Sequence, residues 1–276
     1  MNELPLYIVD AFTGTPFRGN PASVCLLERE LPETTMQMVA AEMKHSETAF
    51  ARPLDGPATF ATRFSLRWFT PQLEVPLCGH ATLATAAVIF RELANPARAI
   101  HFETKSGRLT ARPDGARFAL DFPAEDSQPA TVAPDVLVAL GARSVEAACS
   151  ARKDRSLLLH LASESEVREL APDFSRLRAA RDDAPFLGVI VTAAGSGGYD
   201  FVSRFFAPWV GIDEDPVTGA AHCALTPYWA RLTGKPETRA YQASPRGGEM
   251  AVRLRGERVD LVGEAVVVAA GMLRVA

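Results

Sequence analysis

The sequence predicts a mixed α+β or α/β chain of two pseudo-symmetric halves, each a curled, mostly antiparallel sheet wrapped around a central buried helix. Three observations predict this fold: motifs that recur once in the same order, strand-like segments in both halves, and one nearly all-apolar helix in each half. With 276 residues, 47% of them hydrophobic, both halves can build a core. We place the halves at 1–122 and 123–276, where Ala, Pro, Ser and Asp cluster, and allow the last strand to pack back on the first half.

An internal repeat organises the chain. Three motifs recur in the same order at nearly one offset: R-x-F-x-P at 67–71 and 204–208, P-x-x-G-x-A at 76–81 and 216–221, and a weaker match between 102–107 and 241–248. The offset is about half the chain length. Coincidence of common Gly, Pro and Ala residues explains three ordered matches poorly, so we interpret the chain as two similar halves related by an approximate two-fold axis.

Strands are predicted where apolar residues alternate or run continuously between turn residues. In the first half the predicted strands are 6–11, 22–27, 47–52, 59–69, 100–104, 108–112 and 117–122. In the second half they are 156–161, 186–192, 199–206, 238–242, 249–254, 259–262 and 265–269.

Each half also contains one helix that is apolar on nearly every side. The segment 81–93 has no polar face, which predicts a buried helix ended by Asn95-Pro96. Its counterpart runs over about 220–232 and stops at Gly234, and Pro227 inside it is expected to kink or split it. Amphipathic outer helices are predicted at 34–43 and 172–180.

Composition excludes several classes of protein. The formal charge of -4 and the lack of a basic block argue against nucleic-acid binding, and no apolar run approaches a membrane span. The N-terminus is not a signal peptide, and the four cysteines are widely spaced without a CxxC, which predicts a cytoplasmic location. Walker A, HExxH, EF-hand and Rossmann motifs are absent, so we expect no cofactor. His80 and His222 are not at chelating spacing, so we expect no metal.

The two buried helices begin at matched glycine loops. Helix N-termini present unpaired N–H groups, and if the halves face each other both ends can point into one cleft suited to a carboxylate or phosphate. The alternative is that each glycine only eases packing of helix on sheet. Reactive side chains gather at the same loops: Glu74, Cys78 and His80 in the first, and Asp213, Glu214, Asp215, Thr218 and His222 in the second.

Glu47 is the best candidate for moving a proton. It opens an otherwise apolar strand, where burial would raise its pKa and let it both take and return a proton. The alternative for Glu47 is an edge-strand charge that faces water. His80 has the alternative of a helix residue bonded to a neighbour, Asp215 that of a helix N-cap, and His45 that of an exposed polar residue.

A pair of thiols would suit racemisation, but the repeat partner of Cys78 is Thr218, not a cysteine. Cys223 lies a turn into its helix, where a small buried residue is the default. Cys78 alone is either a thiol activated by a helix N-terminus or a structural thiol.

Seven motifs in their order resemble the phenazine-biosynthesis-like (PhzF-like) family, which is related in fold to diaminopimelate epimerase. They are Gly19-Asn20-Pro21-Ala22, Ser46-Glu47-Thr48-Ala49-Phe50, Arg67-Trp68-Phe69-Thr70-Pro71, Leu77-Cys78-Gly79-His80-Ala81-Thr82, Glu214-Asp215-Pro216-Val217-Thr218-Gly219, Pro227-Tyr228-Trp229 and Ser244-Pro245-Arg246-Gly247-Gly248. The resemblance covers essentially the whole chain. It implies two pseudo-symmetric halves with the active site between them, and a homodimer.

The resemblance also implies roles for single residues. The family's characterised isomerase works without cofactor on a dihydro-hydroxy-anthranilic acid, and its proton-moving glutamate corresponds to Glu47. Its assisting histidine and aspartate correspond to His80 and Asp215. The remaining expected substrate-binding residues are Ser46, Gly79, Thr218, Gly219 and Ala220, with the two glycines donating backbone N–H groups to the substrate carboxylate.

Two positions depart from the family pattern. Ala220 stands where the family usually has a serine, which removes a hydrogen bond worth about 0.5–1.5 kcal/mol and puts the phenazine substrate in doubt. His45 stands where an apolar residue is more usual.

Three functions remain open on the sequence. The first is a cofactor-free isomerase in which Glu47 moves a proton on a small carboxylate substrate. The second is an epimerase with another acid–base pair, such as Cys78 with Asp215. The third is a non-catalytic module on the same scaffold that binds a small anion or a protein.

Overall fold

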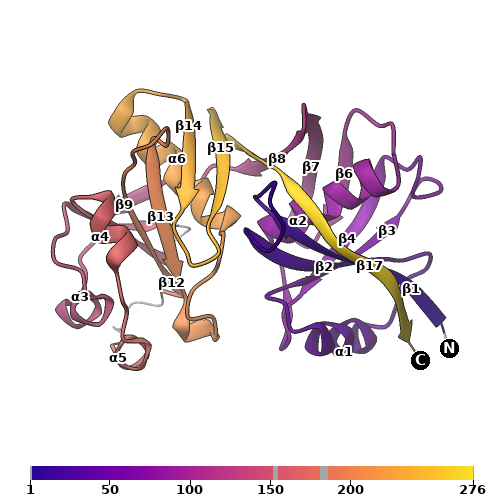
Figure 1. The fold of residues 1–276 in the computed structure, drawn as a ribbon, viewed down its shortest axis with the longest axis horizontal. Helices are drawn as coiled ribbons and strands as arrows, with labels where there is room; N and C mark the ends of the chain where they lie inside the picture. The colour runs from indigo at the N-terminus through magenta and orange to yellow at the C-terminus, as the bar shows by residue number, and fades with distance from the viewer. Residues whose placement is uncertain (1, 152–154, 181–185, 276) are drawn as a thin grey trace. The chain divides into compact units, whose positions relative to one another are not determined.

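The computed structural model describes residues 2–151, 155–180 and 186–275 (Figure 1). These residues form a mixed α/β fold whose strand pairs are mostly antiparallel. The chain divides into two compact units. Unit 1 comprises Met1–Phe122 and Asp260–Ala276, and unit 2 comprises Pro123–Val259, so the last strand packs in unit 1.

Unit 1 is built on ladders that alternate between antiparallel and parallel pairs. Its strands are β1 (Asn2–Ala11), β2 (Asn20–Leu26), β3 (Thr48–Pro53), β4 (Arg63–Phe69), β5 (Glu74–Val75), β6 (Ile100–Thr104), β7 (Gly107–Asp114), β8 (Arg117–Pro123) and β17 (Ala265–Val275). β1 pairs antiparallel with β17 and β2, β2 pairs parallel with β3, and β3 pairs antiparallel with β4. β4 then pairs parallel with β6, and β6 and β7 continue antiparallel to β8. β2 and β3 are apolar and buried nearly throughout because each has a strand on both sides.

The helix α2 (Gly79–Ala87) is the buried helix of unit 1. It packs against β1, β2, β3, β7 and β17, and all nine of its residues are buried. Its two threonines remain satisfied there because Thr82 and Thr85 each donate to the carbonyl four residues earlier. The predicted single helix 81–93 changes type at Val88–Glu92, which is π-helical (η1), with the Leu93 N–H bonded to the Val88 carbonyl. The outer helix α1 (Glu33–Met43) packs through Met36, Val39 and Ala40.

Unit 2 repeats this order of strand pairing. Its strands are β9 (Ser127–Pro129), β10 (Ala147–Ala151), β11 (Ser156–His160), β12 (Gly188–Ala194), β13 (Phe201–Phe206), β14 (Glu237–Gln242) and β15 (Gly248–Arg255). β10 pairs antiparallel with β9 and β11, β11 pairs parallel with β12, β12 antiparallel with β13, β13 parallel with β14, and β14 antiparallel with β15. This is the order of pairings that runs from β1 to β7 in unit 1. The chain returns to unit 1 within β16 (Arg258–Gly263).

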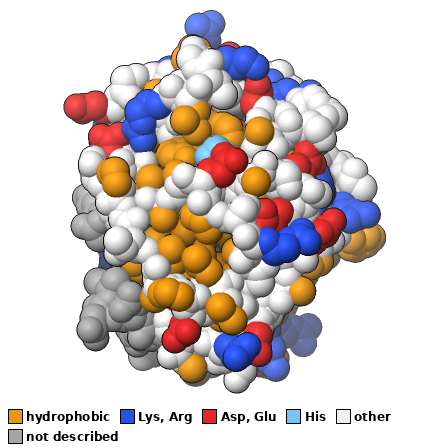
Figure 2. All heavy atoms as spheres, turned by 90° about the vertical axis from the view of Figure 1, so that its left-hand side faces the viewer, with side chains coloured by type: hydrophobic (Ala, Val, Ile, Leu, Met, Phe, Trp, Pro, Cys, Tyr) orange, Lys and Arg blue, Asp and Glu red, His pale blue; other side chains and the backbone are white. Residues whose placement is uncertain are grey.

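Helices cover the strands of unit 2. They are α3 (Pro134–Leu140), α4 (Glu164–Glu169), α5 (Phe174–Ala179), the short 3-10 turn η2 (Pro208–Val210) and α6 (Gly219–Thr233). Leucines and valines of β11 and β12 form one core with Val136, Leu140 and Leu177 of α3 and α5. Figure 2 shows one face of unit 2, on which apolar side chains gather in a band with charged side chains around it.

The helix α6 is continuous, so the predicted split at Pro227 is wrong. Proline has no N–H to donate to the carbonyl of Cys223, four residues earlier. That carbonyl instead accepts the N–H of Glu125 at 3.0 Å, so it is not left without a partner. The dense burial from Ala221 to Trp229 then holds the helix together around the proline.

Other sequence predictions need smaller corrections. The strand predicted at 59–69 starts only at Arg63, because 58–60 form a turn in which the Phe60 side chain is exposed. The prediction missed β5, β9, β10, α3 and α4, all of which are short. No helix in the described part of the chain is both long and apolar enough to cross a membrane.

Candidate functional site

In unit 1, the chain between α1 and β3 carries the predicted proton-moving residue. The helix α1 ends at Met43, and Lys44 caps it in the left-handed conformation with φ 57°. This reversal directs His45, Ser46 and Glu47 onto the end of β3, which pairs in parallel with β2. Because β3 lies between β2 and β4, Glu47 is not an edge-strand charge facing water, and only 14% of its side chain is exposed.

His80 lies in the first turn of α2 and faces Glu47. Its Nε2 lies 3.4 Å from Glu47 Oε2 and 3.4 Å from Ser46 Oγ. Ser46 Oγ in turn donates to Asn20 Oδ1 at 3.4 Å. A carboxylate, an imidazole and a hydroxyl therefore meet at the N-terminal end of a buried helix, where the peptide dipoles favour negative charge.

The His80 ring is neutral in this setting. Burial lowers its pKa to about 3, and the neighbouring His45 lowers the pKa in the same direction. A neutral imidazole has one N–H and one lone pair, so it can donate to Glu47 without becoming an ion. His45 is half-buried, with Nδ1 2.7 Å from Ser23 Oγ, so the alternative of an exposed polar residue is wrong.

Cys78 is the N-cap residue of α2 and makes the second contact to His80. Its Sγ lies 3.6 Å from His80 Nδ1, and its carbonyl accepts from Thr82 Oγ1 at 2.5 Å. Glu47, Cys78 and His80 each offer a possible metal ligand within 4.8 Å of the others. The sulfur contacts Nδ1 and the carboxylate contacts Nε2, so the two groups meet different nitrogens of one ring.

Glu74, which the sequence analysis named as a reactive side chain, instead forms structural ion pairs. Arg67 Nε and Nη2 donate to its two carboxylate oxygens at 2.8 and 2.7 Å, and Lys105 also bonds to it. The hydrogen bond from Arg67 lowers the pKa of Glu74 most, followed by smaller effects of its other partners. The Arg67 guanidinium also lies 5.2 Å from the ring centre of Phe69.

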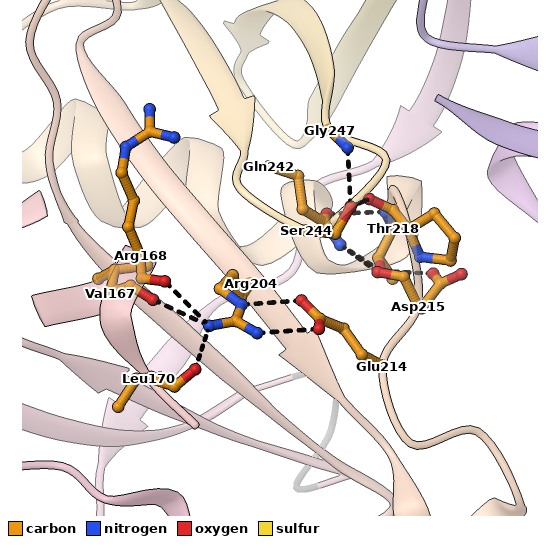
Figure 3. A network of polar contacts seen from close by, with 11 residues as sticks. Val167, Arg168, Leu170, Arg204, Glu214, Asp215, Thr218, Gln242, Ser244 and Gly247 are labelled. Atoms are coloured by element: carbon orange, nitrogen blue, oxygen red, sulfur yellow. Dashed lines mark hydrogen bonds and ion pairs between the residues drawn. The ribbon is translucent and has the colours of Figure 1, made fainter. Parts of the chain in front are cut away.

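In unit 2 the corresponding loop carries a denser network (Figure 3). Thr218 Oγ1 donates to Asp215 Oδ2 at 2.5 Å, and Gln242 Oε1 accepts the Thr218 N–H at 2.8 Å. Gln242 Nε2 donates to the Asp215 carbonyl at 2.7 Å. Ser244 Oγ holds the Pro216 carbonyl at 2.8 Å. The N-cap of α6 is Thr218, so the alternative that Asp215 is the N-cap residue is wrong.

Glu214 is held as Glu74 is. Arg204 Nε and Nη2 donate to its two oxygens at 2.8 and 2.9 Å, and Arg204 Nη1 donates to the Leu170 carbonyl at 2.7 Å. Arg204 also lies 4.9 Å from the ring centre of Phe206. Figure 3 shows this ion pair beside the Asp215 loop. The motif R-x-F-x-P thus marks the same contacts in both units, an arginine that binds the loop carboxylate and stacks on the next phenylalanine.

The two remaining candidates of the second loop, Asp213 and His222, make other contacts. Asp213 forms an exposed ion pair with Arg178 at 2.5 Å. His222 is fully buried, stacks on Phe201 and donates through Nδ1 to the Thr218 carbonyl at 2.8 Å. Burial lowers the pKa of His222 to about 4, against a smaller opposite effect of that carbonyl.

The structure thus brings the predicted residues together within each unit. In unit 1 these are Ser46, Glu47, Gly79 and His80, and in unit 2 they are Asp215, Thr218, Gly219 and Ala220 at the start of α6. Sequence reasoning missed Asn20, Ser23 and Gln242 as polar partners. Gln242 lies within the third repeated motif, but nothing in that motif shows which way its amide points.

The family model described as phenazine biosynthesis-like protein matches residues 9–271. The chain belongs to this family. A Pseudomonas aeruginosa protein named as an uncharacterized isomerase is 46% identical, over 99% of both chains. A crystal structure of a PhzF family protein from Enterococcus faecalis is 41% identical, covers 99% of this chain and 100% of its own, and superposes with a TM-score of 0.91.

Epimerases share the fold of this PhzF-family chain. A hydroxyproline epimerase from Agrobacterium vitis covers 98% of this chain and 92% of its own, with a TM-score of 0.59. Its sequence identity is only 12%, so this likeness concerns the fold alone.

Proposed function

We propose that this chain is a cofactor-free isomerase in which Glu47 takes a proton from one carbon of a small carboxylate substrate and returns it to another. The contact between Glu47 Oε2 and His80 Nε2 at 3.4 Å carries the proposal. Glu47 is mostly buried yet not sealed, so it can reach a bound molecule, and His80 orients it without adding charge. Relatives named as isomerases support the reaction class.

The substrate-binding residues are proposed on the same basis. Gly79 and Gly219 open α2 and α6, where backbone N–H groups lack partners within the helix and favour an anion. Asp215 and Thr218 are held by Gln242 and present a fixed pair of oxygens. We propose that these groups and Ser46 hold the substrate's carboxylate and hydroxyl groups.

We further propose that 1–122 and 123–276 are pseudo-symmetric halves, each folded around its buried helix. The shared order of strand pairings and the matched Arg67–Glu74 and Arg204–Glu214 ion pairs support this. The helix lies between the fourth and fifth strands of that order in each unit, after β4 in one and after β13 in the other.

A dihydro-hydroxy-anthranilic acid is the proposed first substrate to test. Proton NMR in D2O should show rearrangement by the wild-type protein and a loss of about 10²–10⁴-fold in kcat for Glu47→Gln, because one positioned acid–base group contributes that much. Glu42→Gln, on the exposed face of α1, is the matched control and should react as wild type does. Undiminished turnover by Glu47→Gln contradicts the proposal, whereas a requirement for Glu47 with another carboxylate changes only the substrate.

An epimerase based on Cys78 is the second candidate, favoured by the contact of its sulfur with His80 at 3.6 Å. The imidazole can orient the thiol by a hydrogen bond, and the sulfur would act as the base once it has lost its proton. This candidate predicts that Cys78→Ser abolishes exchange of a substrate hydrogen with solvent while Glu47→Gln does not. The two variants therefore separate the candidates. Ligand-induced stabilisation with no chemical change in either would favour a binding module.

A further inference from the structure

Cys78, His80 and Glu47 cluster at the first turn of α2, with one polar atom of each within 4.8 Å of the others. Cys78 Sγ is 3.6 Å from His80 Nδ1, and His80 Nε2 is 3.4 Å from Glu47 Oε2. The thiol and the carboxylate thus use opposite nitrogens of one ring. Whatever fixes the proton on one nitrogen therefore decides what the other nitrogen presents to its partner.

A neutral imidazole carries its single proton on either Nδ1 or Nε2. With the proton on Nε2, the ring donates to the ionised Glu47 or to Ser46 Oγ, and Nδ1 is free to accept a hydrogen bond. With the proton on Nδ1, a lone pair on Nε2 faces the carboxylate and repels it. When Glu47 is ionised it therefore favours the Nε2–H form, and a donor at Nδ1 favours that form further.

The thiol of Cys78 is such a donor, and the fold holds it in place. Cys78 caps α2 with an extended backbone, φ -145° and ψ 121°, and its carbonyl is bound by Thr82. Both Cys78 and His80 are nearly fully buried, so water competes poorly for this contact. The corresponding residue in unit 2, Thr218, instead points its hydroxyl at Asp215.

We propose that Cys78 is a positioning residue whose thiol donates to His80 Nδ1 and thereby keeps His80 in the Nε2–H form that faces Glu47. Its part in catalysis rests on the proposed function, but the tautomer belongs to the free protein and needs no substrate. The sulfur is then neither a base nor a nucleophile. It acts only through the ring.

The test is NMR of protein labelled with ¹⁵N-histidine, using long-range ¹H–¹⁵N correlations that distinguish the two tautomers. The chain has five histidines, and a His80→Gln variant assigns the resonance of His80. Spectra at pH 7.5 should show His80 mainly as Nε2–H in the wild type. Cys78→Ala should shift the tautomer ratio about fivefold toward Nδ1–H, the effect of one lost hydrogen bond. Cys78→Ser keeps a donor and should restore the wild-type spectrum.

Cys223→Ser is the matched control, because Cys223 is a buried thiol near the start of α6 that donates to the backbone carbonyl of Gly219 and lies in unit 2. It should leave the His80 signal unchanged. If Cys78→Ala does not fold, Cys78→Val, which also lacks a donor, takes its place. A wild-type ring that is mainly Nδ1–H, or a tautomer that ignores the residue at 78, overturns the inference.

Turnover separates this inference from the proposed function. Because the wild type is mainly Nε2–H, a fivefold change in the tautomer ratio should lower kcat in Cys78→Ala by up to about threefold with KM unchanged, and Cys78→Ser should recover it. If Glu47→Gln still turns over while the tautomer follows residue 78, the isomerase proposal fails and the inference stands. If Glu47 is required but the tautomer ignores residue 78, the isomerase stands and the inference fails.

Discussion

The loops that start α2 in unit 1 and α6 in unit 2 share a framework but differ in the side chains they hold. Both loops carry a glutamate bound by an arginine, and both helices begin at a glycine after an extended N-cap residue. At the positions around that glycine, Cys78 and His80 in unit 1 correspond to Thr218 and Ala220 in unit 2.

This difference separates a loop that we propose takes part in proton transfer from a loop whose polar groups are held more tightly. In unit 1 the ring of His80 contacts a thiol, a hydroxyl and a carboxylate at 3.4–3.6 Å. At these distances no single pairing of donor and acceptor is fixed. In unit 2 the contacts of Asp215, Thr218 and Gln242 are mostly 2.5–2.8 Å, and each backbone group involved has a partner. The same framework can therefore serve two purposes when only a few side chains change.

The largest expected effect comes from removing the two arginines. Arg204→Met should lower the free energy of unfolding by about 3 kcal/mol or more, because it leaves Glu214 buried without its partner and three carbonyls without a donor. Arg67→Met should cost only about 1 kcal/mol, since Lys105 still binds Glu74 and Arg67 is more exposed. Urea unfolding followed by tryptophan fluorescence measures both.

The exposed pair Arg108–Glu103 supplies the control for these variants. Arg108→Met should change stability by less than about 0.5 kcal/mol. Equal losses for Arg204→Met and Arg67→Met would contradict the view that the second loop is the more rigidly held.

The buried histidines should make both units less stable to unfolding as the pH falls. The folded-state pKa values of His80, about 3, and His222, about 4, lie below the ordinary value of 6.5. Between these values and 6.5 the unfolded chain binds a proton that the folded chain does not, so stability is complete above pH 6.5 and falls as pH falls. Each histidine should contribute a slope on the order of 1.4 kcal/mol per pH unit in that window.

His222→Leu tests this directly. The leucine fills the space against Phe201 and cannot be protonated, so the loss of stability between pH 7 and pH 5 should shrink by about 2 kcal/mol. Urea midpoints at the two pH values measure it. An unchanged difference between the two midpoints in the variant would show that His222 takes up no proton on unfolding.

Patterns along the chain predict the strands well because each strand is defined by its own side chains. β6 was predicted with both ends correct, and β8 and β11 to within one residue at each end. The short elements β9, β10 and α4 were missed because a few residues carry no period, and tertiary packing decides them. Pro227 in α6 shows the same limit, since the partner that accommodates it lies far along the chain at Glu125.

In the candidate site, too, the sequence predicts some residues, whereas the roles of others are seen only in the structure. Motifs predicted Glu47, His80 and Asp215, and the structure places Glu47 beside His80. The roles of Glu74 and Glu214 could not be predicted from residue type alone, because a carboxylate in a loop is reactive or structural according to whether an arginine faces it. The hydrogen bond between the Gln242 side chain and the Thr218 N–H likewise depends on how β14 packs against α6.

The smallest expected effect comes from Ala220→Ser, which adds a hydroxyl in the first turn of α6. Ala220 is partly exposed, so stability should change by less than about 0.5 kcal/mol. If the second loop only holds the substrate, as proposed above, one added hydrogen bond to a bound carboxylate should lower KM by up to about tenfold and leave kcat unchanged. Steady-state kinetics on any carboxylate that requires Glu47 measures this. A rise in kcat at constant KM would show that the second loop also takes part in the chemical step. The proposed difference in role between the loop of His80 and the loop of Ala220 would then be wrong.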